Sequence, residues 1–182
     1  MIRSNKELKH YLEQDKIALK INRSRPKLFS DEIWKYQILL RKSEYYFNKK
    51  KNILECLIYK YYRLNFHRKE VQLGFSIPLN CFGPGLRIVH RGTIVINGNT
   101  KIGENCTIHI GVNIGSKPNE LKSPILGNNV YLGPGVKIYG NIIIGDNVFV
   151  GANAVVNKNF KEGNCTLIGI PAMPKINKKI NE

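Results

Sequence analysis

Two histidines in the second half of this 182-residue chain, His90 and His109, are the side chains best suited to chemistry. An imidazole titrates near neutral pH, so it can take a proton from a hydroxyl group. Taken alone, His90 could equally be a structural histidine at a turn. The four cysteines are far apart and follow no C-x-x-C or Cys/His ligand spacing. The residue types therefore indicate acid–base chemistry rather than a metal centre.

The segment that must position these histidines repeats with a period of six residues. Aliphatic residues recur at every sixth position, with one break: Ile102, Ile108, Ile114, Leu126, Leu132, Ile138, Ile144, Val150 and Val156. This period matches neither strand alternation nor a helix of 3.6 residues per turn. It is typical of a solenoid in which each hexad forms one short strand and one turn around a narrow aliphatic core.

Two further columns accompany the aliphatic one. A column of small apolar residues comprises Cys106, Val112, Val130, Val136, Ile142, Val148 and Ala154. A turn column comprises Asn105, Gly111, Asn129, Gly135, Asn141, Asn147, Asn153 and Asn159. Asn and Gly enter the left-handed backbone conformation most readily, so we expect a turn at each of these positions. The break falls on polar Glu120, which predicts a loop extruded from the solenoid.

The first 70 residues follow a helical pattern, with no glycine and one proline, Pro26. Ser4 and Glu7 have the spacing of a capping box, which predicts a helix through about Ile21. Ser30 is the expected N-cap of a second helix, and a third is expected over Ile53–Phe66. We interpret the aromatic residues of the third helix as packing between helices rather than as a base-stacking platform.

These patterns predict an α+β fold, with an N-terminal helical segment followed by a parallel solenoid. We expect a basic helical region at 1–72, a solenoid domain at 73–176 with its loop at 115–125, and a polar tail at 177–182. The net charge of +16 divides into +10 (18 basic and 8 acidic residues) for 1–72 and +6 (11 and 5) for 73–182.

The N-terminus has no continuous apolar segment, so neither a signal peptide nor a membrane-spanning helix is expected. We therefore expect a soluble cytoplasmic protein. Its basic helical front would suit peripheral contact with an anionic membrane at the inner membrane face.

The hexads resemble the signature of left-handed parallel β-helix acyltransferases, over about Gly74 to Ile176. A more specific resemblance lies in Gly83-Pro-Gly-Leu-Arg-Ile-Val-His-Arg-Gly-Thr-Ile-Val-Ile-Asn97. This segment is similar to the motif of the serine acetyltransferase branch, which includes acetyltransferases of surface-polysaccharide clusters. The resemblance implies that His90 is the general base for direct attack of an acceptor hydroxyl on the thioester of acetyl-CoA.

Departures from the serine enzymes bear on the acceptor. Where those enzymes carry Asp before the catalytic histidine, a partner Asp fifteen residues upstream and Arg-His-Pro in the loop, this chain has Val89, Phe75 and Lys122-Ser123-Pro124. Recognition of a zwitterion needs paired charges. We therefore expect a saccharide or lipid-linked glycan acceptor in capsule or lipopolysaccharide biosynthesis, with serine as the alternative. The expected acceptor contacts are Arg87, His109 and Ser123.

The resemblance also implies how acetyl-CoA is held. In such enzymes the pantetheine arm lies between neighbouring subunits, so a homotrimer is expected, and a dimer of trimers stays open. No metal is expected. The positions that match are Gly115, Ser116, Pro134 and Ala152 for the pantetheine, with Lys158 and Lys175 for the phosphates.

Two other classes were weighed. A zinc-dependent carbonic anhydrase on the same type of β-helix would need three well-placed histidines, and the solenoid segment has only His90 and His109. A non-catalytic solenoid, structural or binding nucleic acid, is suggested by charge alone, so we expect no nucleic-acid partner.

Overall fold

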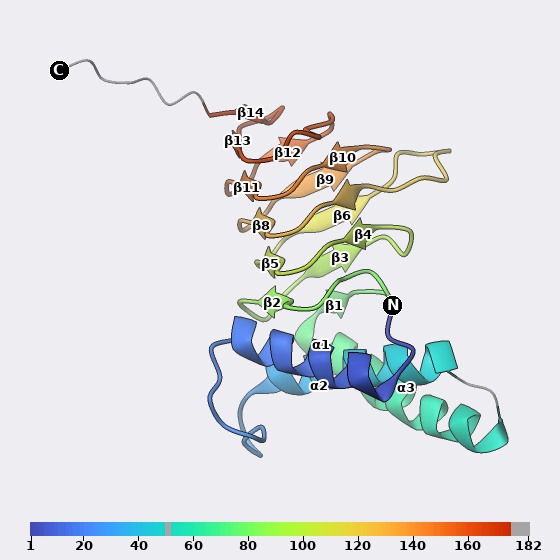
Figure 1. Ribbon diagram of the computed structural model, residues 1–182. Coiled ribbons are helices and arrows are strands. Elements are labelled where there is room, and N and C mark those ends of the chain that lie inside the picture. Colours follow the sequence, from blue (N-terminus) through green and yellow to red (C-terminus); the bar gives the residue numbers. More distant parts are fainter. Residues whose placement is uncertain (50–51, 176–182) are drawn as a thin grey trace.

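The computed structural model describes residues 1–49 and 52–175. Three helices form a layer at one end of the molecule, and the β-strands rise from this layer as a stack of coils (Figure 1). The helices are α1 (Asn5–Ala18), α2 (Glu32–Lys49) and α3 (Ile53–Leu73). None of the described helices is long and apolar enough to cross a membrane.

The helix boundaries follow local capping chemistry. The capping box at the start of α1 is confirmed, because Ser4 Oγ accepts the Glu7 amide at 3.2 Å and Glu7 Oε2 accepts the Ser4 amide at 2.8 Å. Ser30 is not the N-cap of α2. The residue before the helix is Asp31, which adopts φ of +63° and accepts the Lys27 amide at 2.7 Å.

The third helix is longer than expected. It continues past Phe66 to Leu73 and ends where Gly74 takes the left-handed conformation, with φ of +77°. The prediction stopped early because residues 67–73 are good helix formers with few apolar positions to continue the pattern. The aromatic face of α3 packs between helices as expected, with Tyr62 stacked on Tyr46 and Phe66 on Tyr36.

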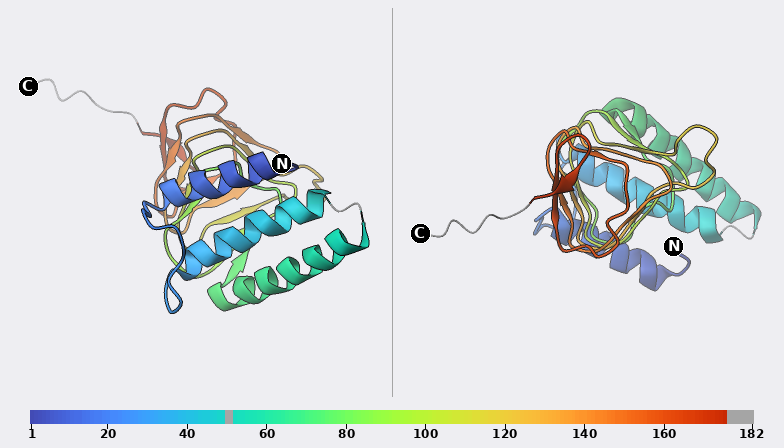
Figure 2. Two further views of the ribbon diagram at one scale, coloured as in Figure 1. Left: turned by 60° about the horizontal axis from the view of Figure 1, so that its bottom comes forward. Right: turned by 90° about the horizontal axis from the view of Figure 1, so that it is seen from above.

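The strands form a left-handed parallel β-helix with three sheets, seen along its axis in Figure 2. The first sheet contains β1 (Phe75–Ser76), β3 (Ile94–Ile96), β6 (Asn113–Gly115), β9 (Lys137–Tyr139) and β12 (Val155–Val156). The second contains β4 (Lys101–Ile102), β7 (Ile125–Leu126) and β10 (Ile143–Ile144). The third contains β2 (Arg87–Ile88), β5 (Thr107–Ile108), β8 (Tyr131–Leu132), β11 (Phe149–Val150), β13 (Thr166–Ile168) and the antiparallel β14 (Met173–Pro174).

The register confirms the hexad pattern. Tyr131 pairs with Phe149, so a regular coil has 149 − 131 = 18 residues, or three hexads. Thr107 pairs with Tyr131 across 24 residues, and the extra six belong to the coil that contains the loop between β6 and β7. All nine predicted aliphatic positions are buried.

The turn column is confirmed at six of its eight positions, which have positive φ. Several of their asparagines form a ladder along the stack, since Asn105 donates to Asn129 and Asn129 donates to Asn147. The other two positions, Asn141 and Asn159, do not adopt the left-handed conformation. Gly140, one residue before Asn141, takes positive φ there instead, so the turn is shifted by one residue.

A buried charge cluster joins the helical layer to the first coil. Arg41 on α2 is fully buried and donates to both Asp15 carboxylate oxygens, at 2.8 and 3.2 Å, and to Glu44 at 3.0 Å. The same guanidinium donates to the carbonyl of Gly83 at 2.7 Å, and Asp15 accepts the amide of Leu86 at 2.9 Å. These contacts fix the backbone that leads directly into β2 and His90.

Candidate active site

His90 lies at the corner that follows β2, where its side chain is exposed to solvent. The corner is anchored by the Val89 amide, which donates to the Ile108 carbonyl at 3.1 Å. The ring of His109, which follows β5 on the next coil, lies 6.0 Å away between centroids. Within the described part of the chain, no residue hydrogen-bonds the His90 ring. The Asp position of the serine enzymes holds Phe75, which is buried.

His109 is half-buried and hydrogen-bonded. Its Nε2 lies 2.8 Å from the Tyr131 hydroxyl, and Tyr131 in turn stacks on Phe149 at 4.3 Å between centroids. Burial lowers the pKa of His109, and the neighbouring His90 and Arg87 lower it further. His109 is therefore favoured as a neutral imidazole at neutral pH, held in place by a tyrosine that rests on the next coil.

Tyr131 is a site residue that the sequence reasoning missed. The signal was present, because Tyr131 occupies the outward position equivalent to Thr107 one coil below and to Phe149 one coil above. The hexad analysis followed inward positions and turns. It did not examine which outward side chains the register stacks beside a histidine.

The register brings some of the expected cofactor residues into line with His90. Continuing the pairing of the third sheet by two residues aligns His90 with Ile110, Pro134 and Ala152 on successive coils. Backbone is exposed at close range along this corner. A Cβ on Gly133 would lie 2.9 Å from the amide nitrogen of Ala152, so only glycine fits beneath it.

The remaining cofactor residues lie at other places. Gly115 and Ser116 end β6, and Lys158 follows β12, so these residues line the corner at the far end of the first sheet. Five residues of extended chain separate Ile110 from Gly115, a distance of roughly 16 Å. One chain thus carries two separate groups of candidate cofactor residues.

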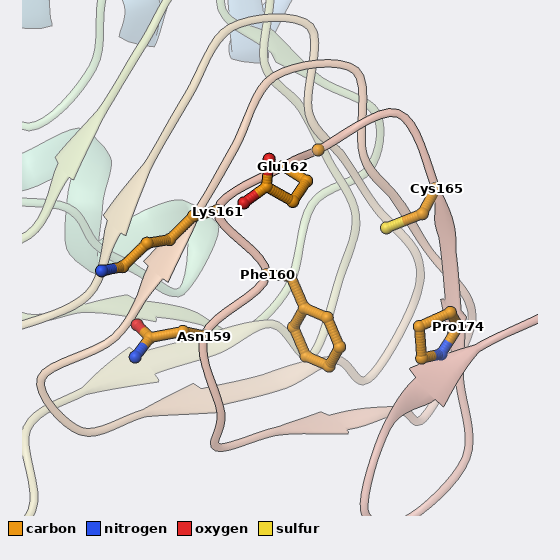
Figure 3. A pocket seen from close by; sticks show the side chains of 7 residues that line it. Asn159, Phe160, Lys161, Glu162, Cys165 and Pro174 are labelled. Carbon is orange, nitrogen blue, oxygen red and sulfur yellow. The ribbon is translucent and has the colours of Figure 1, made fainter.

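Lys175 belongs to neither corner. Its amide donates to the Thr166 carbonyl at 2.7 Å, and it lines a hollow of about 320 Å³ that also includes Phe149. A larger hollow of about 450 Å³ opens at the last coil, where Phe160, Cys165 and Pro174 face it (Figure 3). That hollow is at the end of the stack opposite the helical layer and the first coil.

The three expected acceptor contacts differ in their surroundings. Arg87 lies on β2 and, as its effect on the pKa shows, close enough to His109 to influence it. Ser123 is only 5% exposed, and its hydroxyl bonds to the Ser116 hydroxyl at 2.8 Å and to Asn97 Oδ1 at 2.9 Å. These bonds fasten the loop to the stack, so in this chain the Ser123 hydroxyl is engaged in holding the loop.

A hollow of about 350 Å³ lies between the helical layer and the His90 corner. Arg91, which follows His90, lines it together with Asp31 and Glu32. Both carboxylates are engaged, Asp31 with Arg23 and Glu32 with Lys35. The pKa of each is lowered, that of Asp31 mainly by the Lys27 amide and that of Glu32 mainly by Lys35, so both are ionised at neutral pH.

Within the described residues, no group of three or more His, Cys, Asp or Glu side chains could hold a metal ion. The site therefore combines two imidazoles, a tyrosine, a column of small residues and a hollow with charges of both signs. This arrangement is suited to moving a proton from an acceptor hydroxyl beside a ligand that lies along the coils.

Comparisons with known proteins agree with this architecture. Residues 123–158 match the family model described as bacterial transferase hexapeptide (six repeats). A serine acetyltransferase of Synechococcus elongatus is 38% identical over 112 residues, which are 60% of this chain and 46% of that protein. The chain spans about half the length of the curated relatives it matches best.

Solved structures show the same fold. The serine acetyltransferase of Neisseria gonorrhoeae superposes with a TM-score of 0.66 at 24% identity, over 95% of this chain and 68% of that one. A structure described as a serine acetyltransferase complex with CoA gives a TM-score of 0.70 at 22% identity, over 94% and 70%.

The chain belongs to the hexapeptide-repeat transferases. Within that class it is close to the serine acetyltransferases. The expectation of a saccharide acceptor in polysaccharide biosynthesis is wrong, because the matched relatives and structural neighbours are serine acetyltransferases. The inference failed because it treated the loss of particular charged residues as loss of the acceptor, although other charged groups line the site.

Proposed function

We propose that this chain is an acetyl-CoA-dependent O-acetyltransferase with serine as its acceptor. The observation that carries the proposal is the position of His90 at the foot of a corner formed by Pro134 and Ala152. A thioester lying along that corner would place its carbonyl beside the imidazole. The serine acetyltransferase relatives support the choice of serine.

The reaction is one base-assisted displacement. The His90 imidazole takes the proton of the serine hydroxyl while the oxygen attacks the thioester carbonyl. The carbon–sulfur bond then breaks, the acetyl group stays on the serine oxygen, and the leaving thiolate takes the proton back from the His90 imidazolium. No covalent enzyme intermediate is required, and both atoms and charge balance.

The second imidazole supports this step by staying neutral. A cationic His109 at 6.0 Å would oppose the positive charge that develops on His90. Burial holds the pKa of His109 below its ordinary value, and the Tyr131 hydroxyl fixes its ring. We assign His109 and Tyr131 as a positioning pair whose neutral, oriented ring forms one wall of the acceptor site.

The hollow beside His90 supports a zwitterionic acceptor. Arg91 offers a cation for a carboxylate, and Asp31 and Glu32 place negative charge on the opposite wall, where an ammonium group would be favoured. These residues come from the helical layer and the corner itself. They would replace the charged positions that the chain lacks at Val89 and in its loop.

The coenzyme site requires a second copy of the chain. Pro134 and Ala152 lie at one corner, whereas Gly115, Ser116 and Lys158 lie at the other, roughly 16 Å away along the first sheet. Packing the solenoids side by side as a homotrimer would set one corner of each chain against the other corner of its neighbour. The pantetheine arm would then lie between subunits, with a lysine available to its phosphates.

The proposal is tested by measuring thiol release from acetyl-CoA with L-serine, D-serine, L-homoserine and no acceptor. We expect turnover with L-serine well above the rate without acceptor, with weaker use of the other two amino acids because the hollow fixes both charged groups. Identification of O-acetylserine by mass spectrometry confirms the product. Release that does not depend on L-serine would contradict the assignment.

A further inference from the structure

One face of α3 is packed and the other is open. The packed face lies on α2 through Tyr62 and Phe66. The open face carries large apolar side chains, each at least half exposed: Leu54 (66%), Leu57 (57%), Tyr61 (63%), Leu64 (50%) and Val71 (71%). These residues follow steps of three and four, with Arg68 at the one remaining place, so they form a continuous stripe along the helix.

The charges beside this stripe have one sign. Lys60 and Arg68 are exposed on the same face, and none of the exposed residues of α3 is acidic. The two acidic residues of α3 are drawn away from the open face: Glu55 pairs with Lys49 at 3.3 Å, and Glu70 pairs with Arg63 at 3.0 Å. The open face of α3 is therefore apolar and basic.

A second segment has the same character. In the connection between α1 and α2, Leu28 is 77% exposed and Phe29 is 95% exposed, beside exposed Arg25 and Lys27. The loop is held in this shape by Lys35, whose Nζ donates to the Leu28 carbonyl at 2.6 Å. In Figure 1 this connection and the first turns of α3 lie at opposite ends of the helical layer, on the side away from the β-helix.

A second copy of the chain fits this surface poorly. Antiparallel pairing centred on Leu64 would set Lys60 opposite Arg68, because 60 + 68 equals twice 64, and parallel pairing would set each cation against its own copy. Like charges so placed are unfavourable. Such pairing would also leave Leu28 and Phe29 uncovered, since they lie at the other end of the layer.

A lipid surface fits both segments together. An amphipathic helix with a basic flank lies in the plane of a bilayer with its apolar side chains among the headgroups and acyl chains, and anionic lipids strengthen its binding. We propose that the outer side of the helical layer docks on an anionic bilayer through the α3 stripe and the Leu28–Phe29 loop. The β-helix, with its acetyl-transfer site, would then stand away from the membrane.

The test is co-sedimentation of the full chain with vesicles of phosphatidylglycerol and phosphatidylcholine, or of phosphatidylcholine alone, at physiological salt. We expect binding to the anionic vesicles and weak binding to the neutral ones. Each basic residue near an anionic surface contributes about fivefold, so Lys60→Glu with Arg68→Glu should weaken binding at least about 25-fold. Leu57→Ser with Leu64→Ser should weaken it about tenfold or more.

Matched controls come from the other end of the molecule. Lys161→Glu changes one exposed lysine on the last coils, and Ile143→Ser changes an exposed apolar residue on β10. Both should bind like the wild type. Thiol release in solution should be unchanged in all these variants, which separates loss of docking from loss of folding or activity.

Two results would overturn the proposal. One is a wild-type chain that does not bind anionic vesicles, or whose binding is unaffected by the α3 variants. The other is sedimentation velocity in which Leu57→Ser with Leu64→Ser dissociates a wild-type oligomer while no vesicle binding is seen. That second outcome would assign the α3 stripe to a contact between copies of the chain.

Discussion

The helical layer and the β-helix are held together by different kinds of interaction. In the β-helix, each coil repeats the one below it, with aliphatic side chains stacked inside and backbone hydrogen bonds between coils. The helical layer meets the first coil through a single cluster in which Arg41 contacts Asp15, Glu44 and two backbone carbonyls. A stack spreads its stability over many equivalent contacts, whereas the junction depends on one side chain.

This difference matters because His90 lies at the boundary. The first coil has a repeating neighbour on one side only, and on the other side it rests on the helical layer (Figure 1). The position of His90 is therefore set by the unique contacts as well as by the repeating ones. The following predictions test this comparison, beginning with the largest expected effect.

Replacing Arg41 with Met should cost about 3 to 5 kcal/mol of unfolding free energy, because it leaves Asp15 and Glu44 buried without their cation. Urea denaturation measures this change. Lys6→Met, at an exposed position of α1, is the control and should be neutral within about 0.5 kcal/mol. A loss below about 1 kcal/mol for Arg41→Met would show that the junction does not depend on this cluster.

Leu132→Ala removes a fully buried side chain from the middle of the stack and should cost about 3 kcal/mol. Because this contact is one of many equivalent ones, we expect acetyl transfer by the folded fraction to stay close to normal. In Arg41→Met, by contrast, activity should fall further than the folded fraction does. Equal losses of activity per folded molecule in the two variants would remove the distinction between the regions.

The turn column offers a smaller test. Asn129 has φ of +55° and accepts a side-chain hydrogen bond from Asn105. Asn129→Ala should cost about 1 to 2 kcal/mol, because alanine is strained in the left-handed conformation. Asn129→Gly should recover the backbone part of that loss but not the side-chain bond. If alanine were tolerated as well as glycine, the turn column would not be a conformational requirement.

The smallest expected effect is on the pH dependence of stability. The pKa of His109 in the folded chain lies below its ordinary value of 6.5, so the unfolded chain binds a proton more readily. Wild-type stability should therefore decline as the pH falls below about 6.5, until His109 is protonated in the folded state as well. In His109→Gln this decline should be shallower. Thermal melts between neutral and mildly acidic pH would show it, and identical slopes would refute the shifted pKa.

The sequence was most informative where structure repeats or is capped locally. The hexads predicted the buried stack from Ile102 to Val156, and the spacing of Ser4 and Glu7 predicted the start of α1. These features depend on residues that are near one another in the chain. Their physical cause, strand and turn periodicity or a capping hydrogen bond, is written in the local pattern.

Features that depend on distant partners were missed or misjudged. Arg41 reads as a surface cation until the fold brings it to Asp15, 26 residues away. Tyr131 and His109 meet because one coil in the stack is six residues longer than the others. The acceptor was misjudged for the same reason, since the charges beside His90 include Asp31 and Glu32 from the helical layer.

The most direct test of the central claim is the steady-state rate of acetyl transfer from acetyl-CoA to L-serine by His90→Ala, compared with His10→Ala on the exposed side of α1. General base catalysis contributes about 10²- to 10⁴-fold, so kcat should fall by at least about 100-fold in His90→Ala and stay normal in His10→Ala. The apparent affinity for acetyl-CoA, from protection in a thermal melt, should be retained in both. A His90→Ala enzyme that turns over at a rate near the wild type would contradict the account.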